Sequence, residues 1–312
     1  MLRNMSHFSL GCFLVIFFLV NTACAAFRKV TLNYSDAKLP ESQIMRDVEY
    51  WASPNADLTK NRLDLFLPAE KNFPTFVFVH GGEWIAGDKS LRVLGADIYG
   101  NIGRYFASQG VGVAVISYRL IPDTPWKSQI MDVARSVKWV SENIQKYHGN
   151  PKELFVGGHS SGAQLAVRVA LDATPLNLLN SSPNIICGVI PVSGAGYDLT
   201  DQETYDTAKK EDLFIKLFKT DDISAKLRRQ LSPQRFVNTK APPFLVLYAG
   251  KEEKGLQNGS IALHERLIAS GVHSQLVEIS KKGHRTIVLS LSQPHQVSTA
   301  TMLVFMKSLS CF

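Results

Sequence analysis

Short apolar runs alternate with longer amphipathic stretches along most of this chain. The composition of the short runs predicts strands at 47–50, 62–67, 75–79, 111–117, 154–156, 185–192, 244–248 and 275–279. Apolar residues at helical spacing predict helices at 91–109, 126–147, 162–171, 260–270 and 294–309. Buried strands that alternate with helices predict a mainly parallel sheet with helices on both faces. The pattern therefore predicts an α/β fold.

Residues 195–235 interrupt this alternation. The segment is polar and mixed in character, and it contains one helical stretch near 212–218. We interpret it as a cap-like excursion over the top of the sheet. The chain has 312 residues, of which 45% are hydrophobic and 20% charged, so it is long enough to form one large α/β domain. We expect that domain to span residues 26–312.

The first 25 residues have the pattern of a secretory signal peptide. Arg3 supplies a positive charge, residues 8–20 are mostly apolar, and Ala23-Cys24-Ala25 forms an A-x-A cleavage site. Thirteen residues are too few to cross a bilayer as a helix, which needs about 20. We therefore expect cleavage after Ala25, a secreted or periplasmic protein, and no stable membrane insertion afterwards. A lipid anchor at Cys24 and an uncleaved membrane anchor are the alternatives.

Cleavage would leave two cysteines in the mature chain. Cys187 opens an apolar run and is most simply interpreted as a buried thiol, whereas Cys311 lies next to the C-terminus. They could pair in an oxidising compartment. Two cysteines so far apart in sequence nevertheless predict no particular bond.

The positive charge of the chain does not have the pattern of a nucleic-acid-binding surface. The formal net charge is +7, but the lysines and arginines are scattered in isolated pairs such as Lys209-Lys210, Arg228-Arg229 and Lys281-Lys282. A nucleic-acid interface would need a clustered basic patch with interleaved aromatic residues. We therefore expect no nucleic-acid partner, and the sequence does not predict the oligomeric state.

The segment Gly158-His159-Ser160-Ser161-Gly162 matches the pattern Gly-x-Ser-x-Gly between a predicted strand and a predicted helix. A serine on such a sharp turn is held in a strained backbone conformation, with its hydroxyl exposed at the top of the sheet. Glycines two residues before and after it avoid collisions between strand and helix. The N–H group of Ser161 then lies at a helix N-terminus and can face a developing oxyanion. These features predict that Ser160 is a nucleophile.

A serine nucleophile needs a base, and the base needs an orienting acid, in the chain order serine, acid, histidine. Of the histidines after Ser160, only His284 lies in a loop just past a predicted strand. The acid should come from the loop 249–254, where Glu252 and Glu253 are both candidates and Glu253 is preferred. The predicted catalytic residues are therefore Ser160, Glu253 and His284.

The run His80-Gly81-Gly82-Glu83-Trp84 follows another predicted strand. Two consecutive glycines allow successive N–H groups to point into a cavity, as an oxyanion hole requires. Trp84 is interpreted either as part of the substrate site or as core packing.

The run at 80–84, the run Ser117-Tyr118-Arg119-Leu120 and the Gly-x-Ser-x-Gly segment occur in an order that resembles the α/β-hydrolase superfamily. More narrowly, they resemble its esterase/lipase group with an HGGxW-type oxyanion motif, which includes hormone-sensitive-lipase-like and kynurenine-formamidase-like enzymes. The resemblance covers residues 47–309 and implies an eight-stranded, mostly parallel sheet. It also implies Ser160 as nucleophile, His284 as base, Glu253 as acid, and oxyanion donors at Gly82, Glu83 and Ser161.

The chain departs from the group in two places. Position 83 is Glu where the lipase-like branch often has Gly, so this side chain could narrow or charge the acyl pocket. The acid is Glu instead of the commoner Asp, which leaves the choice between Glu252 and Glu253 open.

These observations predict a secreted serine carboxylesterase that needs no metal or organic cofactor and acts on small or aromatic esters. The polar composition of 195–235 does not have the apolar character of an interfacial lipase lid. An arylformamidase or another small amide hydrolase with the same triad is one alternative, since fold does not determine substrate. A non-catalytic binding or adhesion protein on a hydrolase scaffold is another, although all three catalytic residue types are present.

Overall fold

The computed structural model describes residues 37–93, 95–309 and 311. The predicted signal peptide, including Cys24, lies outside the described residues. Within them, no helix combines the length and the apolar character that crossing a membrane requires.

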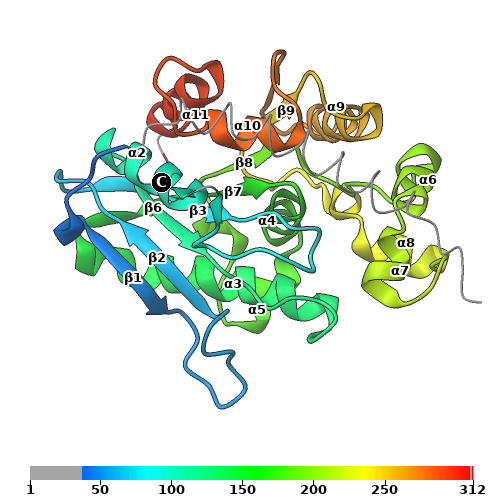
Figure 1. Cartoon of the computed structure of the whole chain (residues 1–312), viewed down its shortest axis with the longest axis horizontal. Helices are drawn as coiled ribbons and strands as arrows, with labels where there is room; N and C mark the ends of the chain where they lie inside the picture. Colours follow the sequence, from blue (N-terminus) through cyan, green and yellow to red (C-terminus); the bar gives the residue numbers. More distant parts are fainter. Residues whose placement is uncertain (1–36, 94, 310, 312) are drawn as a thin grey trace, which may run out of the picture.

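One eight-stranded sheet forms the centre of the molecule (Figure 1). Its strands in spatial order are β1 (Ile44–Glu49), β2 (Arg62–Phe66), β6 (Gly112–Ile116), β3 (Phe73–Val79), β7 (Gly149–His159), β8 (Gly188–Val192), β9 (Phe244–Ala249) and β10 (Ser274–Ile279). Strand β2 is antiparallel to both of its neighbours, and all pairs from β6 to β10 are parallel. This confirms the eight-stranded, mostly parallel sheet.

Helices cover both faces of the sheet, and each face has its own apolar core. On one face pack α3 (Trp126–Asn143), α4 (Ser161–Leu171), α5 (Ala173–Leu178) and α9 (Lys254–Ala269). On the other pack α2 (Ile98–Ser108), α10 (His284–Ser290) and α11 (Val297–Ser308). The central strands are apolar throughout because both of their faces are covered, as in β6 and β8, where every residue is buried.

Two helix boundaries differ from the prediction by six or more residues, and α5 and α10 lie outside the predicted helices. The helix expected over 91–109 is preceded by a small hairpin, β4 (Arg92–Val93) and β5 (Ala96–Asp97), and the side chain of Asp97 caps α2 by accepting from the Gly100 N–H. Helix α9 begins at Lys254 instead of residue 260. Its first turn packs against α6 of the cap (Gln202–Lys210), where a Cβ on Gly255 would lie 3.0 Å from the Thr207 hydroxyl. This turn therefore lacks the apolar pattern of a core-facing helix.

The excursion between β8 and β9 contains α6, α7 (Leu213–Phe218), α8 (Ala225–Leu231) and the 3₁₀ turn η4 (Pro233–Phe236). The stretch expected near 212–218 is α7, whereas the pattern did not predict α6 and α8. Figure 1 shows the three α-helices together at one end of the molecule, beyond the sheet. They enclose a small core of their own, made of Leu199, Tyr205, Ala208, Phe214 and Ile223. We call helices α6, α7 and α8 the cap.

Cys187 and Cys311 form a disulfide with a Cα–Cα distance of 5.6 Å. The bond joins the residue before β8 to the chain after α11, across a sequence separation of 124 residues. The interpretation of Cys187 as a free buried thiol was therefore wrong. The sequence pattern contains no signal for this pair because the contact exists only once β8 and α11 are packed.

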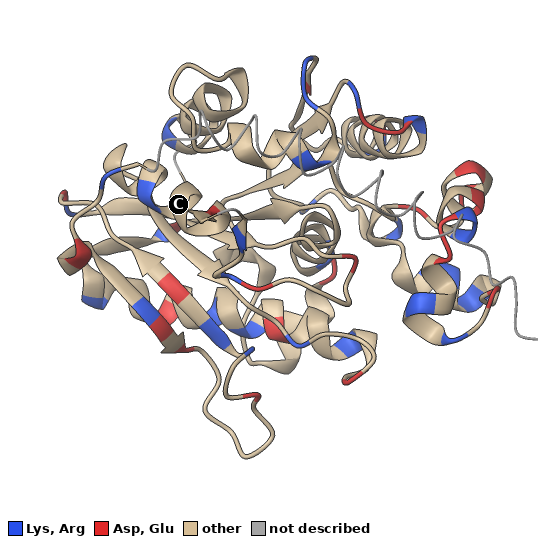
Figure 2. Ribbon diagram, in the orientation of Figure 1, with Lys and Arg blue, Asp and Glu red and all other residues tan. Residues whose placement is uncertain are grey.

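Charged residues of both signs are spread over the helices, strands and loops (Figure 2). In the cap, for example, Asp201 and Glu203 at the start of α6 are followed by Lys209 and Lys210 at its end. The acidic side chains therefore lie at the helix N-terminus, which carries a partial positive charge. The basic side chains lie at the C-terminus, which carries a partial negative charge.

Candidate active site

Ser160 lies at the turn between β7 and α4, with φ 57° and ψ −123°. A non-glycine residue in such a conformation is strained and persists only where its surroundings hold it. The surroundings leave no room for side chains at the flanking glycines: a Cβ on Gly158 would lie 2.3 Å from the Val79 carbonyl oxygen, and one on Gly162 would lie 2.3 Å from the carbonyl oxygens of both Val79 and His80. The glycines therefore allow helix and strand to pack closely enough to present Ser160.

His284 is brought to Ser160 from 124 residues further along the chain. Its Nε2 lies 2.9 Å from the Ser160 Oγ, at hydrogen-bond distance. The histidine is the first residue of α10, and Gly283 and Thr286 form a reciprocal cap at that helix start, in which the Gly283 N–H donates to the Thr286 hydroxyl. The structure thus joins the predicted nucleophile to the predicted base.

The acid that contacts His284 is Glu252, not the preferred Glu253. The Nδ1 of His284 lies 2.9 Å from Glu252 Oε2, and the Glu252 side chain is 0% exposed. Glu253, in contrast, is exposed and is the N-cap residue immediately before α9. The preference for Glu253 was therefore wrong.

The local fold explains this choice between neighbouring glutamates. The second carboxylate oxygen of Glu252 accepts a hydrogen bond from the Ala249 N–H at the end of β9, at 3.0 Å. The Gln257 side chain donates to the carbonyl oxygens of Gly250 and Glu252, so α9 holds the loop in place. Because Glu253 must turn outward to start the helix, only Glu252 faces the end of the sheet.

The predicted oxyanion loop has a backbone conformation that only specific contacts can hold. Gly82, Glu83 and Trp84 have positive φ values of 136°, 54° and 62°. The Gly82 carbonyl accepts from the N–H groups of Ile85 and Ala86, which closes a tight turn. A Cβ on Gly82 would lie 2.1 Å from the Ala86 carbonyl oxygen, so this position requires glycine.

Neighbouring side chains fix this loop from both sides. The Tyr118 hydroxyl donates to the His80 carbonyl at 3.1 Å, and the Gly81 N–H donates to the Tyr99 hydroxyl at 3.3 Å. The Gln129 amide donates to the Trp84 carbonyl at 2.7 Å. The His80 ring stacks on Tyr118, and burial lowers the pKa of His80 to about 4, so this histidine is neutral near pH 7.

The Glu83 side chain lies at the solvent-exposed edge of the site, which we call the rim. Its carboxylate forms an ion pair of 3.1 Å with Lys216 of α7, and the two side chains are 54% and 40% exposed. This contact connects the oxyanion loop to the cap. Glu211, at the end of α6, belongs to the same rim: burial and the neighbouring carboxylate of Glu253 raise its pKa.

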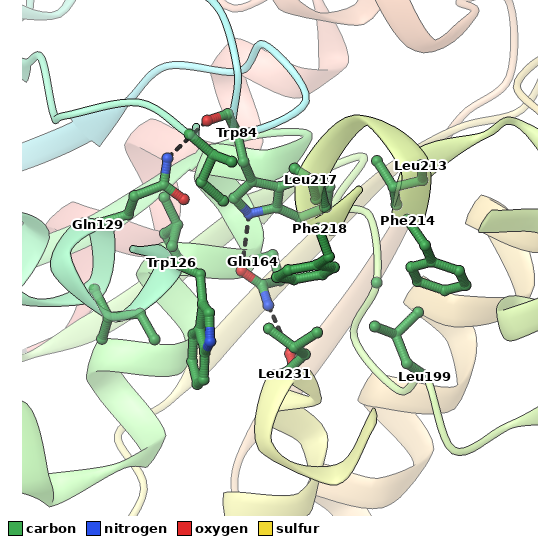
Figure 3. Close-up of a pocket in the computed structure, with 14 residues that line it drawn as sticks. Trp84, Trp126, Gln129, Gln164, Leu199, Leu213, Phe214, Leu217, Phe218 and Leu231 are labelled. Carbon is green, nitrogen blue, oxygen red and sulfur yellow. Dashed lines mark hydrogen bonds between the residues drawn. The ribbon is translucent and has the colours of Figure 1, made fainter. Parts of the chain in front are cut away.

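A small apolar cavity of about 40 Å³ lies between Trp84, α3, α4 and the cap (Figure 3). The cap contributes Leu213, Phe214, Leu217, Phe218 and Leu231 to its lining. The Trp84 indole N–H donates to the Gln164 side chain at 3.3 Å, and Gln164 is one helical turn after Ser160. Trp84 is therefore a buried residue that also lines a cavity beside α4, the helix that follows Ser160. Its part in a substrate site stays a prediction.

Gln164, Gln129 and His159 also belong to this region, and their roles were not predicted from the sequence. Gln164 has a recognisable signal, because a residue four positions after the nucleophile lies on the same face of the following helix. His159 donates to the His284 carbonyl, a contact that no local pattern predicts. In the described part of the chain, no group of three or more His, Cys, Asp or Glu side chains is arranged to hold a metal ion.

Comparison with known proteins gives a consistent result. The model of the BD-FAE family matches residues 63–267 of this chain. Esterase LipC of Mycobacterium tuberculosis is 29% identical over 188 residues, which cover 58% of this chain and 45% of LipC. The isoprenylcysteine alpha-carbonyl methylesterase of Arabidopsis thaliana is 26% identical over 275 residues, covering 84% of this chain and 60% of the relative. The chain thus spans about half the length of the curated relatives it matches.

Solved structures share the fold. Esterase B from Lactobacillus rhamnosis, inhibited by a tributyrin phosphonate, superimposes with a TM-score of 0.68 at 24% identity, covering 96% of each chain. A truncated carbohydrate esterase from gut microbiota gives a TM-score of 0.70 at 17% identity, covering 88% of this chain and 97% of that one. Together with the eight-stranded sheet, these similarities establish the α/β-hydrolase fold that the sequence motifs implied.

Proposed function

This chain belongs to the BD-FAE family within the α/β-hydrolase superfamily, and we propose that it is a secreted serine carboxylesterase that acts through an acyl-enzyme. The observation that carries the proposal is the continuous chain of contacts from Ser160 through His284 to Glu252, in which both links are 2.9 Å long. This arrangement supports the assignment of a serine nucleophile, its base and the acid that orients the base.

In the proposed reaction the Ser160 hydroxyl attacks the ester carbonyl while the His284 Nε2 accepts its proton. The protonated imidazole then donates that proton to the leaving alkoxide, which leaves the acyl group on Ser160. Water attacks the acyl-enzyme by the same route, with His284 as base, and releases the acid. The buried Glu252 carboxylate holds the His284 Nδ1–H and stabilises the charged imidazole.

The N–H groups of Gly82, Glu83 and Ser161 are the proposed oxyanion donors. Ser161 is the first residue of α4, and the first four N–H groups of a helix have no partner within the helix. The positive φ values of Gly82 and Glu83 support a loop shaped for function, because such strain persists where the surrounding structure imposes it. Each donor of this kind typically lowers the barrier by about 3–4 kcal/mol.

The cavity beside Trp84 supports a small or aromatic ester as substrate. Its lining is largely apolar, with Trp126 and Phe218 among the aromatic residues, and it lies between the nucleophile helix and the cap. The proposed chemistry uses side chains and backbone N–H groups alone, without metal or cofactor.

Two observations support a secreted protein. The first 25 residues have the pattern of a signal peptide, and the Cys187–Cys311 disulfide fits an oxidising compartment. Mass spectrometry of the mature protein from the extracellular or periplasmic fraction would test this. An N-terminus at Ala26 is expected, whereas an intact Met1 or a lipid on Cys24 would contradict cleavage after Ala25.

The activity is tested with a fluorophosphonate probe and with p-nitrophenyl acetate and butyrate. We expect the mature protein to be labelled and to hydrolyse both esters, and Ser160→Ala to lose both properties while unfolding at the same temperature. If the folded wild-type protein is not labelled, the esterase proposal is wrong and a non-catalytic binding function takes its place. Hydrolysis of a matched anilide in preference to the ester would instead indicate an amide hydrolase.

A further inference from the structure

His159, the last residue of β7 and the neighbour of Ser160, has no part in the mechanism described above. The residue is only 6% exposed, so an ionisable side chain is buried beside the reacting groups. It also lies against the oxyanion loop, since a Cβ on Gly81 would come within 3.1 Å of the His159 Nδ1.

The contact that this imidazole makes determines its protonation. The Nε2 of His159 lies 2.7 Å from the carbonyl oxygen of His284. A carbonyl oxygen only accepts hydrogen bonds, so Nε2 must carry the proton and donate it. Burial, followed by the proximity of His284, lowers the pKa of His159 to about 3, which keeps the ring neutral with Nδ1 unprotonated.

This hydrogen bond acts on the backbone of His284, whereas the two catalytic contacts act on its ring. The His284 ring is held at both nitrogens, by Ser160 and by Glu252. Its backbone is the first residue of α10, where the preceding residue is glycine. A donor on the His284 carbonyl therefore restrains the position from which the imidazole reaches Ser160.

We propose that His159 is a positioning residue, which fixes the backbone of His284 through its Nε2–H and does so as a neutral ring. The neutral state matters because the two rings lie with their centroids 4.9 Å apart. In the proposed reaction His284 becomes positively charged, and a second charge at this distance would oppose that step. The inference rests on the proposed function for its kinetic consequences, but the hydrogen bond itself can be tested without turnover.

Three variants distinguish the effect of the hydrogen-bond donor from the effect of the side chain's shape. The amide nitrogen of His159→Gln is the same number of bonds from the backbone as Nε2, so it can donate to the same carbonyl. The amide of His159→Asn reaches only the position of Nδ1. His159→Leu fills similar space without any donor.

We expect His159→Leu and His159→Asn to lower kcat by about 10- to 100-fold, as a misplaced catalytic group does, with KM changed less than twofold. His159→Gln should stay within about threefold of wild-type kcat, because a charge-neutral donor is restored. Thermal unfolding of all variants identifies any that fail to fold. The proposal is overturned if a folded His159→Leu keeps wild-type kcat, or if a folded His159→Gln is as impaired as His159→Leu.

Proton NMR provides a readout that does not depend on turnover. The His284 Nδ1 proton, hydrogen-bonded to the Glu252 carboxylate, should give a resolved downfield signal that Glu252→Gln removes. We expect His159→Gln to keep this signal and His159→Leu to shift or broaden it. If the wild-type protein has no esterase activity but this pattern is found, the proposed function fails and the positioning role stands. If the signal is identical in His159→Leu and the wild type, the positioning role is wrong.

Discussion

The end of the sheet that carries the proposed catalytic residues and the cap beside it are held in place by different forces. At the sheet, Glu252 is bound by the Ala249 N–H, and the His284 carbonyl is bound by His159. The cap is joined to the rest of the molecule mainly through apolar side chains around the cavity and through the exposed Glu83–Lys216 pair. In addition, Gln164 and Arg168 of α4 donate to carbonyls at the end of α8.

We expect this difference to separate catalysis from substrate selection in the proposed reaction. Directional hydrogen bonds to fixed backbone positions allow little adjustment, so a change at the sheet should remove activity almost completely. Apolar packing is tolerant of shape and volume, so a change in the cap should alter activity by degrees. The following predictions test this contrast.

The largest effect is expected at the acid. Glu252→Gln replaces a charged acceptor with a neutral amide at the His284 Nδ1, so kcat should fall by about 10³- to 10⁴-fold, as it does when the orienting acid of a triad is lost. Glu253→Gln is the matched control, because it makes the same change on an exposed neighbour, and it should stay within about threefold of wild type. Steady-state kinetics on p-nitrophenyl acetate measures both. The reverse ranking of the two variants would restore Glu253 as the acid.

The disulfide should affect the stability of the scaffold and leave the chemistry unchanged. Cys311→Ser releases a crosslink across 124 residues, which is expected to cost about 2–5 kcal/mol in the free energy of unfolding. Chemical denaturation measures this cost, and Ser308→Ala, at the end of the preceding helix α11, serves as a control. Below the unfolding transition kcat should remain at the wild-type value. A wild-type protein with two titratable thiols would show that the bond is absent in solution.

Acidification should lower the free energy of unfolding through two buried histidines, His80 and His159. The folded-state pKa values of His80 and His159, about 4 and about 3, are below the ordinary value of 6.5. The unfolded chain therefore binds more protons as pH falls through 6.5, and the free energy of unfolding decreases by up to about 1.4 kcal/mol per pH unit for each histidine.

Urea denaturation between pH 7 and pH 5 measures this slope. His159→Gln should be less sensitive to pH than wild type, because one of the two buried groups no longer titrates. An unchanged slope in that variant would show that His159 does not remain neutral through burial.

The cap should give a graded effect that depends on the length of the substrate. Phe218→Ala removes one wall of the cavity, so kcat/KM for p-nitrophenyl octanoate should fall about tenfold while that for acetate changes less than twofold. Ile215→Ala is the control, since this residue of the same helix is 46% exposed and does not line the cavity. An equal loss for both esters would show that the cavity does not select the acyl group.

The smallest effect is expected at the rim. Lys216→Gln removes an ion pair between side chains that are 40% and 54% exposed. Solvent and salt screen such a pair, so the free energy of unfolding should change by less than about 1 kcal/mol. We expect kcat/KM to stay within threefold of wild type at physiological salt. A larger loss of activity would make the Glu83–Lys216 pair part of the catalytic geometry and weaken the contrast between sheet and cap.

Much of the fold and part of the site could be predicted from sequence because they depend on local patterns. The alternation of buried strands with helices predicted the sheet, and Gly-x-Ser-x-Gly between strand and helix predicted the turn at Ser160. His284 could be selected because its position just past a predicted strand distinguished it from the other histidines. Four helices, α5, α6, α8 and α10, were not predicted. Helix α6 packs within the cap and no residue of α8 is buried, so neither has the pattern of a helix on the main core.

The sequence by itself determined the order of strands and helices, the strained serine turn and the residue types available for catalysis, because each depends on neighbours within a few positions. Only the tertiary structure decided between Glu252 and Glu253, paired Cys187 with Cys311, and placed His159 on the carbonyl of His284. Adjacent glutamates have the same local preferences, and only the start of α9 and the packing of its loop against the sheet make them different. Contacts between residues more than 100 positions apart arise when helices and strands pack, and the local pattern of hydrophobic and polar residues contains no information about them.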